Sequence, residues 1–186
     1  MAMVKGTPKA VALLLLAGSM LGAESDPGVI GEYHVKAAFL YNFAKYVQWP
    51  ADAPTARAGT FVITILGNDP FGPSLDEILK GKVIDRLKVV VRRAGSPEDL
   101  GASHIVFISD SQRGQLPEIL KRLEGTPTLT VAEMDHFAER GGVIRFRMDG
   151  DRVRLDINPG AAARARLKIS SELLKLARIV GPAAEG

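Results

Sequence analysis

The segment from residue 35 to residue 50 combines a helical spacing of apolar residues with five large aromatic side chains, which are Phe39, Tyr41, Phe43, Tyr46 and Trp49. At about 100° per residue, the apolar positions cover roughly half of the helix or more. The remaining face is formed by His34, Asn42, Lys45 and Gln48. The pattern predicts a largely buried helix over residues 29–48. It ends before Pro50, because a proline disfavours helical geometry in the residue before it.

Lys36 interrupts this pattern, because it projects between two apolar lines of the helix. One interpretation is that its stem lies along apolar surface while its amine reaches water. The other is that the amine pairs with a carboxylate from another element, or supplies charge to a pocket lined by Phe39 and Phe43. Replacement of Lys36 by methionine separates these interpretations, since only loss of a buried pair is destabilising.

Four apolar runs follow, separated by segments with helix or turn signals. The predicted strands span residues 60–66, 87–91, 104–108 and 128–131, and the intervening helices span 74–79, 109–124 and 133–140, with a helical turn at 96–98. Such continuous apolar strands are typical of a parallel sheet that is buried on both faces. Strands that alternate with helices connect through right-handed crossovers. The pattern therefore predicts a three-layer α/β fold with a mostly parallel sheet flanked by helices.

The pattern changes after residue 142. Residues 143–148 and 152–157 alternate strictly between apolar and polar, and Asp149-Gly150 lies between them, so they predict an antiparallel hairpin. Asn158 then caps a helix with Pro159 in its first turn. This long final helix extends to about residue 180, with an optional interruption at residues 167–170.

The first 23 residues have the layout of a secretory signal peptide. Lys5 and Lys9 precede the apolar run at residues 10–17, and Ala23 supplies a small residue before the expected cleavage point. An uncleaved anchor is the alternative, although the run is short for a membrane span. Residues 24–186 form one domain with room for a sizeable core.

Charge and composition narrow the function classes. The first 23 residues contain two lysines and no acidic residue, so the remainder has 22 basic and 21 acidic residues. This near-neutral balance argues against nucleic-acid binding. The chain contains no cysteine, which excludes thiol chemistry, and its three histidines lack the spacing of a metal site. We therefore expect no metal and no cofactor.

Four arginines lie on one face of the predicted hairpin. The expected cross-strand pairs are Arg147 with Arg152 and Arg145 with Arg154. Like charges in opposite positions are unfavourable, so one hypothesis is a site for a phosphate, a carboxylate ligand or an acidic partner surface. Arg164 and Arg166, early in the next helix, extend this site. The alternative is a solvated face that is neutralised by Asp156, Glu133, Asp135 or Glu139.

The carboxyl edge of the parallel strands is a second candidate, because open α/β sheets bind ligands there. The sequence contains no dinucleotide fingerprint, no P-loop and no G-x-S-x-G elbow. An exported hydrolase therefore has the least support. The polar residues at this edge are more simply interpreted as turn and helix caps; they include Asp69, Ser74, Ser109 and Asp110. Asp69 is kept as a candidate binding residue.

Several motifs occur in order between residues 31 and 180 and resemble the YfiR family of periplasmic proteins. They are YHVKAAFLYNFAKYVQWP, ILGNDPFG, HIVFIS, LTVAE, FAERGGVIRF, RLDIN and LKISSELLKLARIV. One departure concerns Ser103, where many relatives have a cysteine. This chain therefore lacks the disulfide-based redox control that the resemblance would otherwise imply.

The resemblance implies a periplasmic regulator rather than an enzyme. Its expected action is to bind and inhibit the periplasmic part of an inner-membrane diguanylate cyclase or sensor kinase, which affects cyclic di-GMP and biofilm output. An outer-membrane lipoprotein is a further implied partner, and homodimers occur in the family. We expect the arginine hairpin and the final helix, with Arg164, Arg166 and Lys168, to form the contact surface. The alternative is a periplasmic binding protein for a small anionic ligand, which a thermal-shift screen would reveal.

Overall fold

The structure is a computed structural model that describes residues 27–53, 55 and 59–181, and for residues 27–30 it describes the backbone alone. The expected signal peptide lies outside the described residues. The centre of the molecule is a parallel sheet whose strands occur in the spatial order β6, β5, β2, β4. These strands are β2 (Thr60–Leu66), β4 (Leu87–Ala94), β5 (Ile105–Ile108) and β6 (Leu129–Ala132). All residues of β5 and β6 are buried, as the continuous apolar runs predict.

The hairpin extends this sheet on the β6 side. β7 (Ile144–Asp149) runs parallel to β6, and β8 (Arg152–Ile157) runs antiparallel to β7. A further strand, β10 (Ala177–Ile179), pairs in parallel with β8 and forms one edge, while β3 (Val83–Ile84) forms the other. A separate small sheet joins β1 (Val47–Gln48) to β9 (Lys168–Ile169).

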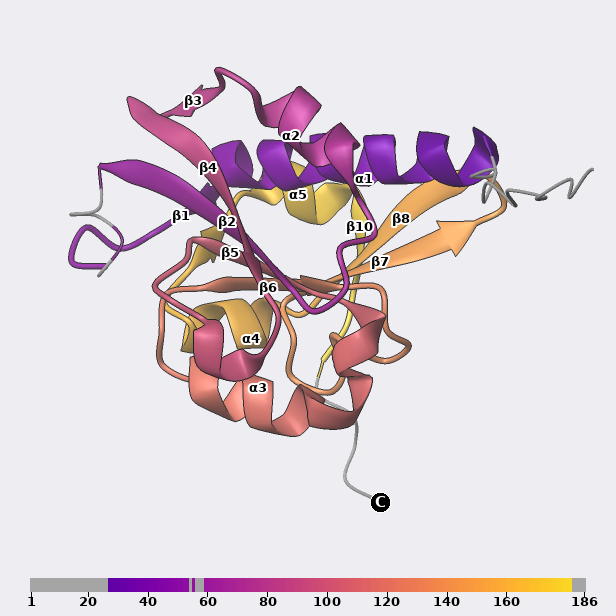
Figure 1. The fold of residues 1–186 in the computed structure, drawn as a ribbon. Helices are drawn as coiled ribbons and strands as arrows, with labels where there is room; N and C mark the ends of the chain where they lie inside the picture. The colour runs from indigo at the N-terminus through magenta and orange to yellow at the C-terminus, as the bar shows by residue number, and fades with distance from the viewer. Residues whose placement is uncertain (1–26, 54, 56–58, 182–186) are drawn as a thin grey trace, which may run out of the picture.

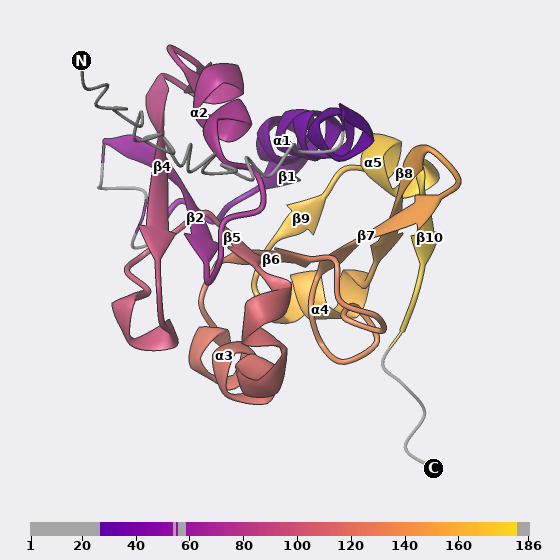
Figure 2. The same ribbon diagram turned by 45° about the vertical axis from the view of Figure 1, so that its right-hand side comes forward.

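Helices cover both faces of the sheet, which confirms the three-layer prediction. One face carries α1 (Pro27–Tyr46), α2 (Pro73–Leu79) and α5 (Ser171–Lys175), and the other carries α3 (Leu116–Leu123) and α4 (Pro159–Arg164) (Figure 1). Two short 3-10 helices, η2 (Pro97–Asp99) and η3 (Asp110–Gln115), precede β5 and α3. Figure 2 shows α1, α2 and α5 above the sheet and α3 and α4 below it.

Each face has its own apolar core. Under α1, the rings of Phe43 and Phe146 stack with centroids 5.7 Å apart, and Phe39 lies 6.0 Å from both. Under α3, Leu116 and Ile119 pack against β5 and β6. The broad apolar surface of α1 is explained by its contacts, because this helix packs against both the sheet and α2.

The predicted helix at residues 133–140 is wrong, because this segment is a series of turns. Met134, Phe137 and Ala138 have helical spacing and are all buried, which accounts for the incorrect prediction. However, His136 has a positive φ of 57°, which a right-handed helix does not allow. The turns place the buried side chains in the core below the sheet.

The predicted long final helix is also wrong, although the interruption at residues 167–170 is confirmed. Asn158 caps α4 as expected and accepts a hydrogen bond from the Ala161 N–H. Arg166 then has a φ of 57°, which ends the helix. After α5 the chain becomes extended, because β8 offers a free edge on which Arg178 lies opposite Asp156.

Candidate functional site

Lys36 is a buried cation that joins α1 to the carboxyl end of β6. Its side chain is 3% exposed, and its amine forms ion pairs with Glu32, one turn earlier, and with Glu133, directly after β6. A lysine that simply reached water would be exposed at its tip. The interpretation that Lys36 pairs with a carboxylate from another element is therefore confirmed.

Tyr33 completes this cluster. Its hydroxyl donates a hydrogen bond of 3.0 Å to Oε2 of Glu133, and its ring meets Phe71 edge-on at 5.4 Å. The Lys36 amine lies 4.6 Å from the centre of the same ring, within the range of a cation–π contact. Burial, followed by the negative charge of Glu133, raises the pKa of Tyr33 well above its usual value. The phenol therefore stays protonated and remains a hydrogen-bond donor to Glu133.

The hairpin has a different register from the predicted one. Arg147 pairs with Arg154, and Arg145 lies opposite Asp156 instead of another arginine. The physical reason is the turn, in which Gly150, with a φ of 57°, occupies the first central position. Each residue of β7 therefore lies opposite a residue of β8 that is two positions later than expected. Because side chains alternate with a period of two, the arginines still lie on one face while Phe146 and Leu155 lie on the other.

Asp156 is the centre of the charged face. It is fully buried and accepts two hydrogen bonds from Arg178, of 2.9 Å from Nε and 2.7 Å from Nη2. Arg145 and Arg147 approach the same carboxylate at 3.4 and 3.6 Å. Burial alone would raise the pKa of Asp156, but the hydrogen bonds and charge of Arg178 and the charges of Arg147 and Arg145 outweigh it and lower the pKa. The arginines thus keep this buried carboxylate ionised.

Three acidic residues after β6 connect the two clusters, and we call residues 133–139 the carboxylate segment. Glu133 binds Lys36, Asp135 pairs with Arg145, and Glu139 lies 3.6 Å from Arg178. These contacts agree with the alternative interpretation of the hairpin face, in which acidic residues of the same domain neutralise the arginines. The carboxylate segment therefore ties α1 to β7 and β10 through side-chain charges.

Asp69 acts as a turn cap. Its Oδ1 accepts hydrogen bonds from the N–H groups of Phe71 and Gly72, at 2.8 and 3.3 Å, and its Oδ2 pairs with Arg93 at 2.8 Å. Ser109 stands before η3 but makes no side-chain capping bond. The cap interpretation therefore holds for Asp69 and not for Ser109.

The crevice between the carboxyl ends of β2 and β5 is occupied by the protein itself. The Asn68 N–H donates to the Ser111 hydroxyl at 3.0 Å. A Cβ atom on Gly67, whose φ is 87°, would lie 2.4 Å from that hydroxyl and 2.8 Å from Cγ of Gln112. Side chains of η3 thus fill the place where open α/β sheets bind ligands.

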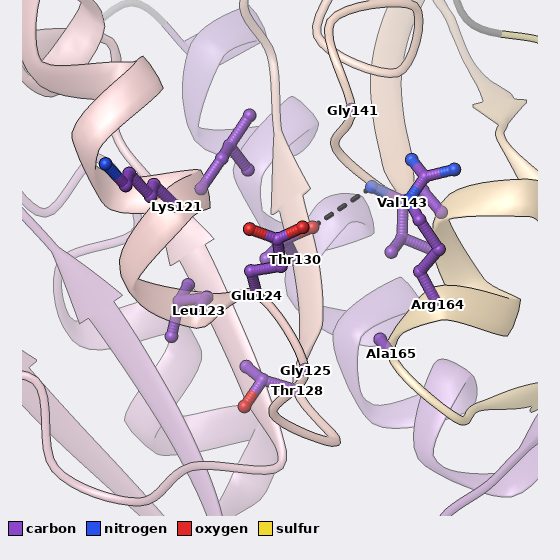
Figure 3. Close-up of a pocket in the computed structure, with 12 residues that line it drawn as sticks. Lys121, Leu123, Glu124, Gly125, Thr128, Thr130, Gly141, Val143, Arg164 and Ala165 are labelled. Atoms are coloured by element: carbon purple, nitrogen blue, oxygen red, sulfur yellow. Dashed lines mark hydrogen bonds between the residues drawn. The ribbon is translucent and has the colours of Figure 1, made fainter.

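Arg164, Arg166 and Lys168 do not join the hairpin arginines. Arg166 pairs with Asp52 at 2.9 Å, and Lys168 lies in β9 opposite Gln48. Arg164 lies beside a cavity of about 220 Å³ between α3 and α4 (Figure 3). Sequence reasoning missed this cavity, because its lining comes from α3, β6, α4 and the segments before β6 and β7, and no local motif connects them.

Among the described residues, none of the helices is long and apolar enough to cross a membrane. Within the same ranges, no group of three or more His, Cys, Asp or Glu side chains could hold a metal ion.

The protein is an α/β domain in which its own side chains fill the crevice at the carboxyl ends of the parallel strands. The model of the YfiR/HmsC-like family matches residues 33–178, and the chain belongs to this family. The match covers Tyr33, Lys36 and the carboxylate segment. Comparison with curated proteins gives no match.

The solved structures that are similar to this one include two proteins of low sequence identity. A conserved domain protein from Vibrio cholerae O1 biovar El Tor has 14% identity and a TM-score of 0.52, over 79% of this chain and 59% of that chain. It supports the fold alone, and this chain spans less than two thirds of its length. The ABC domain in complex with L-Trp from Streptococcus pneumoniae has 10% identity and a TM-score of 0.48, over 67% of this chain and 56% of that one.

Proposed function

We propose that this protein is a periplasmic regulator that binds the periplasmic part of an inner-membrane diguanylate cyclase or sensor kinase and inhibits it. The observation that carries this proposal is membership of the YfiR/HmsC-like family over nearly the whole described domain. Lys36, Arg145 and Arg178 are held in ion pairs within the domain, so the proposed contact surface is formed by other, exposed residues. The effect of such a regulator is to lower cyclic di-GMP and thereby biofilm output.

The contact surface in this proposal lies along β10 and the neighbouring hairpin. Leu176 is 71% exposed and Ile179 is 53% exposed, and the outer edge of β10 carries no further strand of the described sheet. Met148, Arg152 and Arg154 are also exposed on the hairpin. Exposed apolar residues with arginine and methionine are typical of protein interfaces, and an open strand edge can accept a strand from a partner.

Inhibition needs only a difference in affinity between two states of the partner. A regulator that binds the inactive conformation better than the active one shifts the population toward inactivity. Coupling of about 1–3 kcal/mol corresponds to roughly 5- to 150-fold in affinity. An outer-membrane lipoprotein that competes for the same surface would release the enzyme, and a second copy of this chain would compete in the same way.

The test is a pull-down from solubilised inner membrane with the mature protein as bait. We expect recovery of a cyclase or sensor kinase, and we expect Ile179→Lys to abolish it. Val83→Lys is the matched control, because Val83 is also 53% exposed but lies on β3 at the opposite edge of the sheet. Recovery of no membrane enzyme by a well-folded bait would refute the regulator, whereas unchanged recovery with Ile179→Lys would refute only the surface.

Inhibition is tested in membranes that contain the recovered enzyme. We expect cyclic di-GMP synthesis in isolated membranes to fall when the mature protein is added and to recover with Ile179→Lys. An increase in synthesis would contradict inhibition and identify an activator.

A further inference from the structure

The cavity between α3 and α4 is separate from the charged carboxyl edge. Its volume is about 220 Å³, and its floor is formed by Thr128, Thr130 and Val143 at the starts of β6 and β7. The walls come from the last turns of α3 and α4 (Figure 3). This volume is below the range of about 300–1,000 Å³ that is typical for drug-sized ligands, so the site suits a small molecule.

The cavity has one buried hydroxyl that can donate. Thr130 is 5% exposed, and its Oγ1 accepts a 3.0 Å hydrogen bond from the Val143 N–H, shown dashed in Figure 3. A threonine hydroxyl both donates and accepts. Thr130 makes no other side-chain hydrogen bond within residues 31–53, 55 and 59–181. Its hydroxyl hydrogen is therefore left for a ligand.

The carbonyl groups at the end of α3 already have donors. The Leu123 carbonyl accepts the Thr126 N–H at 3.1 Å and the Thr126 hydroxyl at 2.6 Å, and the Lys121 carbonyl accepts the Glu124 N–H at 3.2 Å. These bonds reduce the negative potential that the end of a helix would otherwise present to an anion.

Two opposite charges flank the cavity without pairing. Arg164 extends from α4 toward Gly141 and Val143, and Glu124 extends from α3 toward Thr130 (Figure 3). Neither forms an ion pair with another residue in the described part of the chain, whereas Arg145 and Arg178 on the hairpin side each contact two carboxylates. Arg164 is thus a cation with its guanidinium still available.

We propose that this cavity binds a small monocarboxylate with an apolar body. The guanidinium of Arg164 pairs with the carboxylate, and the Thr130 hydroxyl donates to it. The apolar body packs against the side chains of Leu120, Leu123, Val143, Ala161 and Ala165. Glu124 selects for a single negative charge, because a second carboxylate in the same small space would be repelled by it. This site goes beyond the proposed function, and its test needs no partner protein.

The experiment is a calorimetric titration of the mature protein with isovalerate and, separately, with succinate. We expect saturable binding of isovalerate, with a Kd on the order of 1 mM or tighter, and succinate weaker by about tenfold or more. Arg164→Gln should weaken isovalerate binding at least about tenfold, because the charged partner is lost. Arg86→Gln is the matched control, since it removes an exposed arginine from the turn between β3 and β4, at the opposite edge of the sheet, and it should leave the affinity unchanged.

A second variant keeps the proposal falsifiable if Arg164→Gln alters folding. Glu124→Gln changes an exposed side chain and removes its repulsion of a second carboxylate. The affinity for succinate should therefore be higher in this variant than in the wild type. Thermal unfolding of each variant checks that it is folded. The proposal is overturned by a lack of isovalerate heat in the wild type, by equal affinity for succinate and isovalerate, or by unchanged isovalerate affinity in a folded Arg164→Gln variant.

Discussion

Replacement of Lys36 by methionine tests whether the buried ion-pair cluster stabilises the fold. Removal of one partner from a fully buried pair costs about 3–5 kcal/mol, whereas an exposed pair contributes only about 0.2–1 kcal/mol. Lys36 is 3% exposed, but Glu32 and Glu133 are 25% and 24% exposed, so water can partly solvate the carboxylates left behind. Methionine keeps most of the apolar stem of the lysine. We therefore expect a loss of about 2 kcal/mol, between these two limits.

This loss is measured by urea unfolding followed by circular dichroism. For a domain of this size, about 2 kcal/mol corresponds to a decrease of roughly 4–8 °C in Tm. Lys45→Met on the same helix is the control, because Lys45 is exposed and its amine contacts only the Tyr41 ring among the described contacts, at 4.4 Å. It should change the free energy of unfolding by less than about 0.5 kcal/mol.

A double-mutant cycle with Glu133→Gln isolates the pair itself. We expect the sum of the stability losses in the two single variants to exceed the stability loss in the double variant, since either change removes the same interaction. A Lys36→Met protein as stable as the wild type, or more stable, would refute the reasoning and would show that desolvation of the amine outweighs its two ion pairs.

Three further predictions concern other buried polar groups. Burial lowers the pKa of His104 to about 4 from an ordinary value of 6.5, so the unfolded chain binds the proton first as the pH falls. Stability should therefore decrease between about pH 6.5 and pH 4, by up to about 3 kcal/mol, and His104→Gln should remove this part of the pH dependence in unfolding followed by Trp49 fluorescence. Asp156→Asn should cost about 3–5 kcal/mol in urea unfolding, because it leaves Arg178 and the hairpin arginines facing a neutral group; a cost below about 1 kcal/mol would contradict the central role of this carboxylate. Asn158→Ala should cost about 1–2 kcal/mol, since it removes the 2.9 Å cap to the Ala161 N–H and the 2.7 Å bond to the Ala138 carbonyl, and unchanged stability would argue against the cap.

The spacing of apolar residues was sufficient to predict those helices and strands whose buried positions match the local sequence pattern. The strand at residues 60–66 consists of apolar and β-branched residues, and residues 61–66 are buried on both faces, so its sequence and its surroundings agree. The helix that carries Lys36 was predicted for the same reason. The segment from residue 133 was not, because Met134, Phe137 and Ala138 have the spacing of a helix while the chain reaches the core through turns.

The sequence predicted which residues belong to the candidate site, but it did not predict which of them form ion pairs with one another. The chain shows that Arg145 and Arg147 share a face, because alternation along a strand is a local property. Their partners depend on the hairpin register and on the strand formed by residues 177–179, which brings Arg178 to Asp156. A local pattern cannot contain this contact, since the strand forms only where β8 provides a free edge.

The sequence by itself determined that this chain folds as a mostly parallel α/β sheet with an aromatic helix on one face, because side-chain spacing decides which surfaces avoid water. It also determined that Lys36 is an exception within that helix. The tertiary structure alone decided which carboxylates neutralise Lys36, because Glu133 is 97 residues away in the chain. It alone decided that Arg164 borders a cavity while Arg145 and Arg178 are held in ion pairs, because charge interactions depend on distance in space and not on separation in sequence.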